Sequence, residues 1–227
     1  MKRYWWIFAL IAIALLLSWW IPNPGRTLDA RALANLPWAI EPLPGGHTRV
    51  FGIVLGEATL DDLRQVQGDD MEVAIVAAPG EEGAIEAYYA QLMLGFIQAK
   101  MIVTVDAPKD LISRMRERAI KAEYMESATR KIRLHPDDLA LARQLPIRAL
   151  AVIPSANLDE SIITERFGVP GEQLQVSPTR RHLLYPDKGL DVVLDQDGKE
   201  LLQYVAPRHF AILRDPLRMQ ADALARK

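Results

Sequence analysis

Two stretches with a similar pattern decide how this chain folds: RVFGIVLGEATLDDLRQVQG at 49–68 and RALAVIPSANLDESIITERFG at 148–168. Each contains a short apolar run, a turn of small residues, a helix and a closing glycine. Thr59 and Asn157 can cap the two helices, because a side-chain oxygen at this position accepts a hydrogen bond from the first turn. A glycine after a helix suits the left-handed conformation, so we expect a positive φ at Gly168. The chain therefore carries a weak internal repeat.

Three β-like runs follow each of these helices. They are 71–78, 84–92 and 96–105 after the first helix, and 180–185, 190–194 and 201–205 after the second. Tight turns such as DQDG at 195–198 join consecutive runs, which is typical of antiparallel hairpins. Further helices are expected at 109–121, 136–144 and 216–225, with a strand at 130–134. The sequence therefore predicts an α+β fold that contains a tandem helix-plus-three-strand antiparallel module.

The first residues have the pattern of a membrane anchor. Lys2 and Arg3 precede an uncharged run at 4–21, whose length as a helix, about 27 Å, is close to the hydrocarbon thickness of a bilayer. Tryptophan is favoured at headgroup depth, and the two ends of the run carry Trp5, Trp6, Trp19 and Trp20. We expect one N-terminal transmembrane helix that contacts the lipid bilayer through 4–21. A cleaved signal peptide and a buried soluble helix are the alternatives.

The flanking charges give the expected orientation and location. Lys2 and Arg3 favour a cytoplasmic N-terminus, although Arg26 and Arg31 lie beyond the run. This predicts a single-pass protein of the inner (cytoplasmic) membrane with a periplasmic C-terminal domain. The expected organisation is a membrane anchor at 1–21, a linker rich in proline and glycine at 22–47, a first α+β repeat with a connecting helix at 48–134, and a second α+β repeat with a C-terminal helix at 135–227.

Beyond its helix, the second copy contains several short motifs. They are Gly168-Val169-Pro170, HLLYP at 182–186, GLDVVLDQDG at 189–198 and KELLQYV at 199–205. With them, residues 157–205 resemble the SmpA/OmlA (BamE-like) family of outer-membrane-assembly lipoproteins, whose fold is shared with the β-lactamase inhibitor protein. The resemblance, fainter over 59–105, implies a helix pair on a three-stranded antiparallel meander that can occur in tandem. The family's lipidated cysteine is missing here, and no site residue carries over.

Composition excludes several classes of site. Without cysteine there is no disulfide, thiol catalysis or thiolate metal site. A net charge of −2 and a pI of about 6.1 offer no basic excess for nucleic acid. The four histidines are not at metal-ligand spacings, and the phosphate-loop, dinucleotide-binding and G-x-S-x-G motifs are absent. We therefore predict no catalytic residue, no cofactor and no metal.

Two charge clusters are candidates for contact with a protein partner, since opposite charge speeds encounter and sets register. One is acidic and lies at 57–72, and the other is basic and lies within 114–133. Most charge runs are simply solvated surface, which is the alternative. The candidate contact residues are Arg114, Arg116, Arg118, Asp61 and Asp62.

Three functions remain open from the sequence. The leading hypothesis is a membrane-anchored, non-catalytic interaction or assembly factor, an accessory protein of a bacterial envelope or inner-membrane complex with an unknown protein partner. The second is a lipid or small-ligand binding module with an apolar cavity between sheet and helices. The third is an enzyme with a spatially assembled site, which would bring His182, Asp187 and Asp191 into one deep pocket.

Both copies should contribute to the core, with about 1.5–3 kcal/mol from each large apolar side chain that is buried. The expected core residues are Ile53, Leu55, Leu63, Val66, Ile75, Ile102, Val152, Ile162, Phe167, Leu184, Val192 and Leu202.

Overall fold

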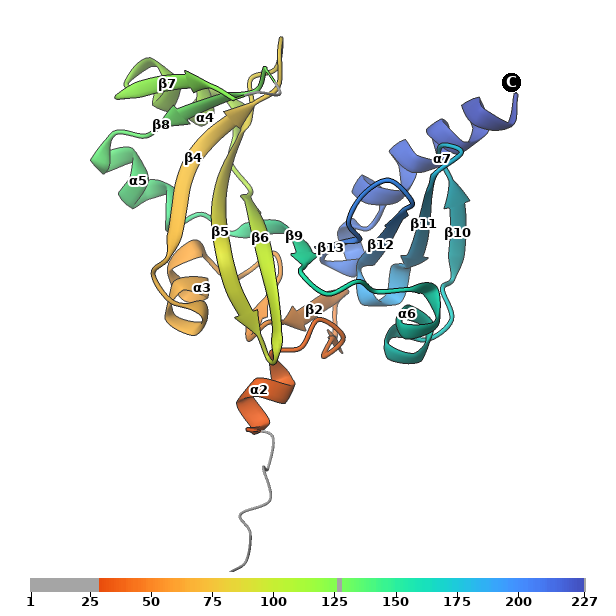
Figure 1. Ribbon diagram of the computed structural model, residues 1–227. Helices are drawn as coiled ribbons and strands as arrows, with labels where there is room; N and C mark the ends of the chain where they lie inside the picture. The colour runs from red at the N-terminus through yellow and green to blue at the C-terminus, as the bar shows by residue number, and fades with distance from the viewer. Residues whose placement is uncertain (1–28, 126–127, 227) are drawn as a thin grey trace, which may run out of the picture.

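The computed structural model describes residues 29–125 and 128–226 (Figure 1). Over these residues the chain forms two antiparallel sheets and six α-helices. The helices are α2 (Ala30–Ala34), α3 (Leu60–Gln67), α4 (Lys109–Glu117), α5 (Pro136–Ala142), α6 (Glu160–Phe167) and α7 (Ala211–Ala225), with short 3-10 turns η1 (Pro186–Lys188) and η2 (Pro207–His209). The predicted α+β class with antiparallel sheet is confirmed.

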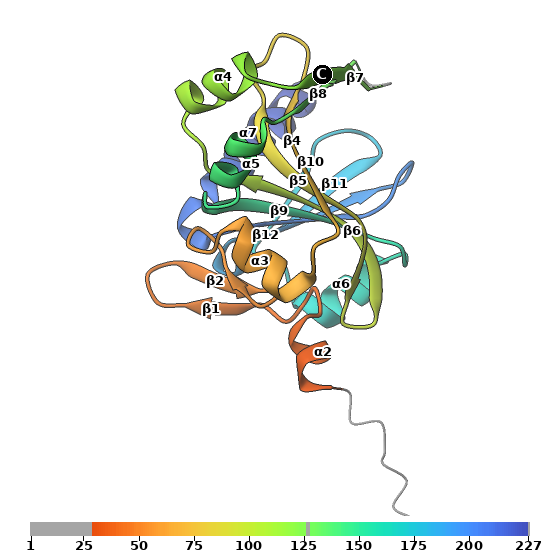
Figure 2. The same ribbon diagram turned by 90° about the vertical axis from the view of Figure 1, so that its left-hand side faces the viewer.

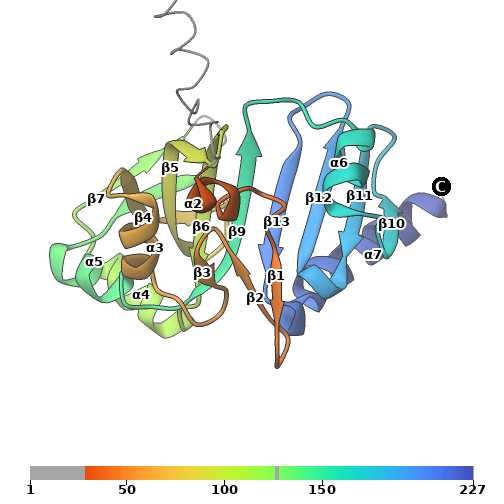
Figure 3. The same ribbon diagram turned by 90° about the horizontal axis from the view of Figure 1, so that it is seen from below.

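A small sheet contains β1 (Glu41–Leu43), β2 (His47–Val50) and β3 (Ile53–Val54). The large sheet contains β4 (Met71–Ala77), β5 (Ala84–Leu94), β6 (Ile97–Val105), β7 (Lys121–Tyr124), β8 (Arg130–Arg133), β9 (Ile147–Pro154), β10 (Glu172–Gln175), β11 (Arg180–Tyr185), β12 (Leu190–Asp195) and β13 (Leu201–Val205). Its strand order is β10-β11-β12-β13-β9-β6-β5-β4-β8-β7. Figure 3 shows β4, β5 and β6 on one side of β9, and β13, β12 and β11 on the other.

The predicted tandem architecture needs correction, because the two copies do not form separate, equivalent modules. Their meanders join through β9 into one sheet. In the first copy, Phe51 (φ 52°) and Gly52 (φ 80°) turn the chain sharply between β2 and β3. In the second copy, the corresponding apolar run has no glycine and forms the continuous strand β9. The presence of Gly52 in the first run therefore accounts for a short hairpin there, where the second run forms a central strand.

The two predicted helices α3 and α6 are present, but one cap differs. Thr59 caps α3 as expected and forms a capping box with Asp62. The N-cap of α6 is Asp159 rather than Asn157, and its carboxylate accepts a hydrogen bond from the N–H of Ile162 at 2.9 Å. The predicted positive φ at Gly168 is confirmed at 84°.

The main core lies on one face of the large sheet, where α3, α4, α5, α6 and the small sheet all cover it. Most of the predicted core residues are buried, but Val66, Ile102 and Ile162 are only partly buried. Ile102 was placed wrongly, because it alternates with the buried Met101 and Val103 and points to the opposite face of β6. Among the described helices, α7 alone packs on that opposite face, through Leu217.

Residues 29–47 of the predicted linker belong to the fold. They include α2, β1 and the first residue of β2 (Figure 2). Trp38 packs edge-on against Phe167, with ring centroids 6.4 Å apart, and the hydroxyl of the buried Tyr204 donates to the carbonyl of Pro37 at 3.0 Å. This segment therefore links the beginning of the chain to the second copy.

The predicted membrane helix also requires correction. Trp5, Trp6, Trp19, Trp20 and the whole run 4–21 lie outside the described residues. Within 29–125 and 128–226, no helix combines the length and apolar character needed to cross a bilayer. The structure therefore does not support the predicted transmembrane helix, the inner-membrane location or the periplasmic placement of the C-terminal domain.

Phe167→Ala should destabilise the fold by about 3–5 kcal/mol through the cavity that it leaves. The ring is 2% exposed and contacts Trp38 and Tyr185. Val169→Ala is the matched control, because Val169 is 84% exposed, and it should change the free energy of unfolding by less than about 0.5 kcal/mol. Guanidinium denaturation of the full chain measures both values, and equal effects would contradict the packing described for α6.

Asp62→Asn should reduce stability at neutral pH, with a difference from the parent protein that shrinks as the pH falls. The N–H of Thr59, and secondly its hydroxyl, lower the pKa of the Asp62 carboxyl. A lowered folded-state pKa gives stabilisation that is present above the unfolded-state pKa and is lost as the pH falls through the folded-state value. Thermal melts between neutral and acidic pH measure this, with the exposed Asp70→Asn as control. A pH-independent difference would refute the capping assignment.

Candidate functional site

The large sheet has an uncovered region on the face opposite the main core, which we call the open face. It lies on β5, β6, β9 and β13, between the β4 side of the sheet and α7 (Figure 1). Cross-strand pairing aligns Tyr88, Ile102, Ala151 and Gln203 in one row. All four are at least partly exposed, so this row is an accessible strip with three apolar members. An accessible apolar strip of this kind is a feature of binding surfaces.

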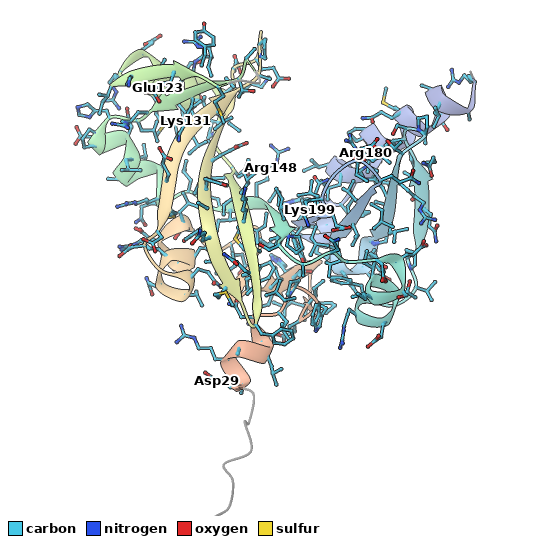
Figure 4. The ribbon with its side chains drawn as sticks, viewed as in Figure 1. Asp29, Glu123, Lys131, Arg148, Arg180 and Lys199 are labelled. Atoms are coloured by element: carbon cyan, nitrogen blue, oxygen red, sulfur yellow. The ribbon has the colours of Figure 1, made fainter. Side chains whose placement is uncertain are left out.

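Two irregularities in strand pairing lie beside the strip. The β5–β6 register shifts between Tyr89 and Leu92, and the β6–β9 register shifts next to Val105. In the second shift Arg148 has no partner on β6, while Ala149 pairs with Thr104. Such bulges increase local twist and redirect a side chain. Figure 4 shows Arg148 extending into the space between the two halves of the sheet.

The open face has an excess of unpaired positive charge. Lys100 pairs with Ile153 across the strands, so it lies on the same face as Ile102. The side chains of Lys100 and Arg148 are exposed, and neither forms an ion pair or hydrogen bond with another described residue. The opposing charge is Glu86, a half-buried carboxyl whose pKa is raised by that burial. The two cations Lys100 and Arg148 therefore outnumber Glu86 on this part of the sheet.

A buried polar network continues the same row beyond β13. Gln203 pairs with Asp191, and the amide of Gln203 donates to Asp191 Oδ2 at 3.2 Å. His182 Nδ1 lies 2.8 Å from the same oxygen and 3.1 Å from Oδ1. Asp191 is fully buried and His182 is 5% exposed. Burial raises the pKa of the Asp191 carboxyl, and the hydrogen bond from His182 opposes that shift.

This network forms part of the floor of a cavity between α7 and the sheet. The cavity has a volume of about 370 Å³, which is within the range of small-ligand sites. His182, Val193, Leu201 and Gln203 lie on its sheet side, and Leu217 lies on its helix side. Arg180 and Lys199 also line it, and both are labelled in Figure 4. The lining is mixed, with more polar than apolar side chains: Asp195 and Gln220 are polar like His182, Gln203, Arg180 and Lys199, and Val176 joins the apolar Val193, Leu201 and Leu217.

The basic residues proposed from the sequence have partners within the fold. Arg114 pairs with Asp110 at 2.6 Å, and Arg116 donates to the carbonyl of Glu82 at 3.0 Å. Arg118 pairs with the buried Asp138. They lie on α4 and at its end, away from the open face. Their role in partner contact stays a prediction, and the charges of Arg114 and Arg118 are already paired with carboxylates.

The acidic candidates are also engaged in contacts that organise α3. Asp61 accepts a hydrogen bond from Gln144 at 2.5 Å and lies 3.3 Å from Arg64. Asp62 belongs to the capping box. Their role in partner contact likewise stays a prediction.

The enzyme hypothesis is met only in part by the geometry. The fold brings His182 and Asp191 together, whereas Asp187 lies in η1 and contacts neither of them in the described chain. The cavity lining contains no serine, threonine or cysteine. In 29–125 and 128–226 no three His, Asp or Glu side chains are grouped to hold a metal ion. The dyad could polarise a water or a ligand, but it has no nucleophile beside it.

The sequence prediction missed Lys100, Arg148 and Gln203 as candidate site residues. Alternation along 97–105 was a usable signal, because Lys100 and Ile102 share a side of the strand. No local signal indicates that Ala151 and Gln203 continue that row, since this depends on the pairing of strands far apart in the chain. No protein-family model, curated protein or solved structure matches the chain. The resemblance to the SmpA/OmlA family therefore stays a prediction.

His182→Leu should destabilise the protein by about 3–5 kcal/mol, because it leaves the buried Asp191 carboxyl with the neutral amide of Gln203 and without the imidazole. The double variant His182→Leu with Asp191→Leu should cost less than that single change, since it removes both polar groups. Urea denaturation of the full chain at neutral pH compares the two. A double variant at least as destabilised as the sum of the two single variants would show that the pair is not energetically coupled.

Proposed function

We propose that the protein is a non-catalytic binding module that docks a protein partner on its open face. The partner presents apolar side chains to the strip of Tyr88, Ile102 and Ala151, and acidic side chains to Lys100 and Arg148. The observation that carries this proposal is the accessible apolar row flanked by two unpaired cations. An assembly or accessory role in a larger complex is the corresponding biological hypothesis.

The arrangement of charge supports an acidic partner in particular. Lys100 lies beside Ile153 on one side of the strip, and Arg148 lies beyond Ala149 on the other side. Two positive groups on opposite sides of an apolar strip favour a segment with acidic residues on both sides of an apolar centre. The strands are fixed by pairing on both sides, so the surface is largely formed before binding.

Photo-crosslinking tests where the partner docks. A benzophenone amino acid is placed at Ile102 of the full chain in its native cells, and at Gln65 on α3 as a control for a surface away from the open face. The expected result is a discrete adduct from position 102 that is absent from position 65. The crosslinked protein is then identified and purified for affinity measurements.

Affinity measurements with that purified partner decide the role of charge. Lys100→Glu with Arg148→Glu should weaken binding at least tenfold, about 1.4 kcal/mol, and the parent protein's binding should weaken with added salt. Lys109→Glu is the matched control, because Lys109 is 87% exposed on α4 and should not affect binding. The proposal is wrong if Lys109→Glu or Arg114→Glu reduces affinity while the open-face reversals do not.

A further inference from the structure

The cavity under α7 is a side chamber of the open face. Leu201 and Gln203 of β13 line it, and the neighbouring strand β9 contributes Ala151, which pairs with Gln203, to the open face. The chamber lies under Leu217 and Gln220 of α7. A side chain or small molecule on the open face can therefore reach the chamber without crossing the main core, which lies on the other side of the sheet.

Among the described residues, one lysine that lines the chamber has no acidic partner. Arg180 is neutralised by Asp195, with Nε and Nη2 at 2.9 and 2.6 Å from the same carboxylate oxygen. Lys199 instead donates only to neutral oxygens, the carbonyl of Ser155 at 3.3 Å and Oδ1 of Asn157 at 2.5 Å. A lysine with only neutral partners remains free to attract an anion.

The His182–Asp191 pair gives the chamber a directed polar group. Because Asp191 engages Nδ1, the other ring nitrogen, Nε2, is left for a ligand in the chamber that His182 lines. Asp191 is fully buried, and the imidazole of His182 is its closest polar partner. Nε2 can donate a hydrogen bond to a ligand when it carries a proton.

Four apolar side chains also line the chamber, beside the amides of Gln203 and Gln220. Val193 and Leu201 line the chamber from β12 and β13. Leu217 lines it from α7, and Val176 lines it from the turn after β10. We propose that the chamber binds a carboxylate carried on an apolar stem. The stem packs on Val193, Leu201 and Leu217, and the carboxylate accepts hydrogen bonds from Lys199 Nζ and His182 Nε2. The same chemistry can come from a free small acid or from an acidic side chain of a docked partner.

Titration of the full chain with octanoate and octanol tests the proposal. Both probes have the same apolar stem, but octanoate carries a carboxylate and octanol a neutral hydroxyl. Methyl chemical shifts of Val193 and Leu201 should move with octanoate at millimolar concentrations, and octanol should bind at least tenfold more weakly. Lys199→Met keeps an unbranched side chain and removes its charge. This change should reduce the affinity for octanoate to the affinity for octanol. Lys109→Met, at an exposed lysine outside the chamber, should change nothing.

Each outcome bears directly on the proposal. Equal affinity for octanoate and octanol, or octanoate binding that is insensitive to Lys199→Met, overturns it, as does the absence of any shift at Val193 and Leu201. A thermal melt confirms that Lys199→Met remains folded. If octanoate also displaces the purified partner that crosslinking identified, the partner supplies the carboxylate. Octanoate binding without displacement of that partner assigns the chamber to a free small acid. Octanoate binding with no protein partner on the open face supports the chamber and rejects only the docking proposal.

Discussion

The pairing of β6 with β9 is the constraint on which the rest of the structure depends. It aligns Met101 with Val152 and Ile102 with Ala151, and it joins strands from the two halves of the chain. Because neighbouring residues on a strand point to opposite faces, one register places Met101 and Val152 in the core and their neighbours on the open face. A shift by one residue would bury Lys100 and expose Met101, so the core and the candidate site are specified by the same register.

The two copies show how far one local difference can change an architecture. Both supply an apolar run before a capped helix, but Gly52 allows the first to turn back within a few residues. The second run, 148–153, has no glycine and becomes the strand that pairs with both β6 and β13. The asymmetry therefore leaves a single central strand, and the two meanders share it. Two complete central strands would instead have allowed two separate sheets.

Local elements could be predicted from the sequence because their signals are local. The turn and cap residues placed α3, α6 and the hairpins within a few residues of their observed ends. The face of Ile102 was wrong because an apolar side chain was taken as a core residue, and its partners Tyr88 and Ala151 are known only from long-range pairing. Likewise Arg148 becomes a surface cation through a bulge, a feature set by the alignment of two distant strands.

The polar network of His182, Asp191 and Gln203 under α7 is the part of the sheet that packing explains least. Asp191 and His182 occupy positions where two apolar side chains would pack on α7 as Leu184 and Val205 do. Buried ion pairs contribute little net stability compared with apolar residues of similar volume, because desolvation offsets their attraction. A contribution to stability therefore explains little about why the His182–Asp191 pair is present. Ligand binding explains it better, because the cavity contains an oriented ring nitrogen and a lysine that has only neutral partners among the described residues. The same strands that form the core thus carry, on their reverse side, the groups suited to recognition.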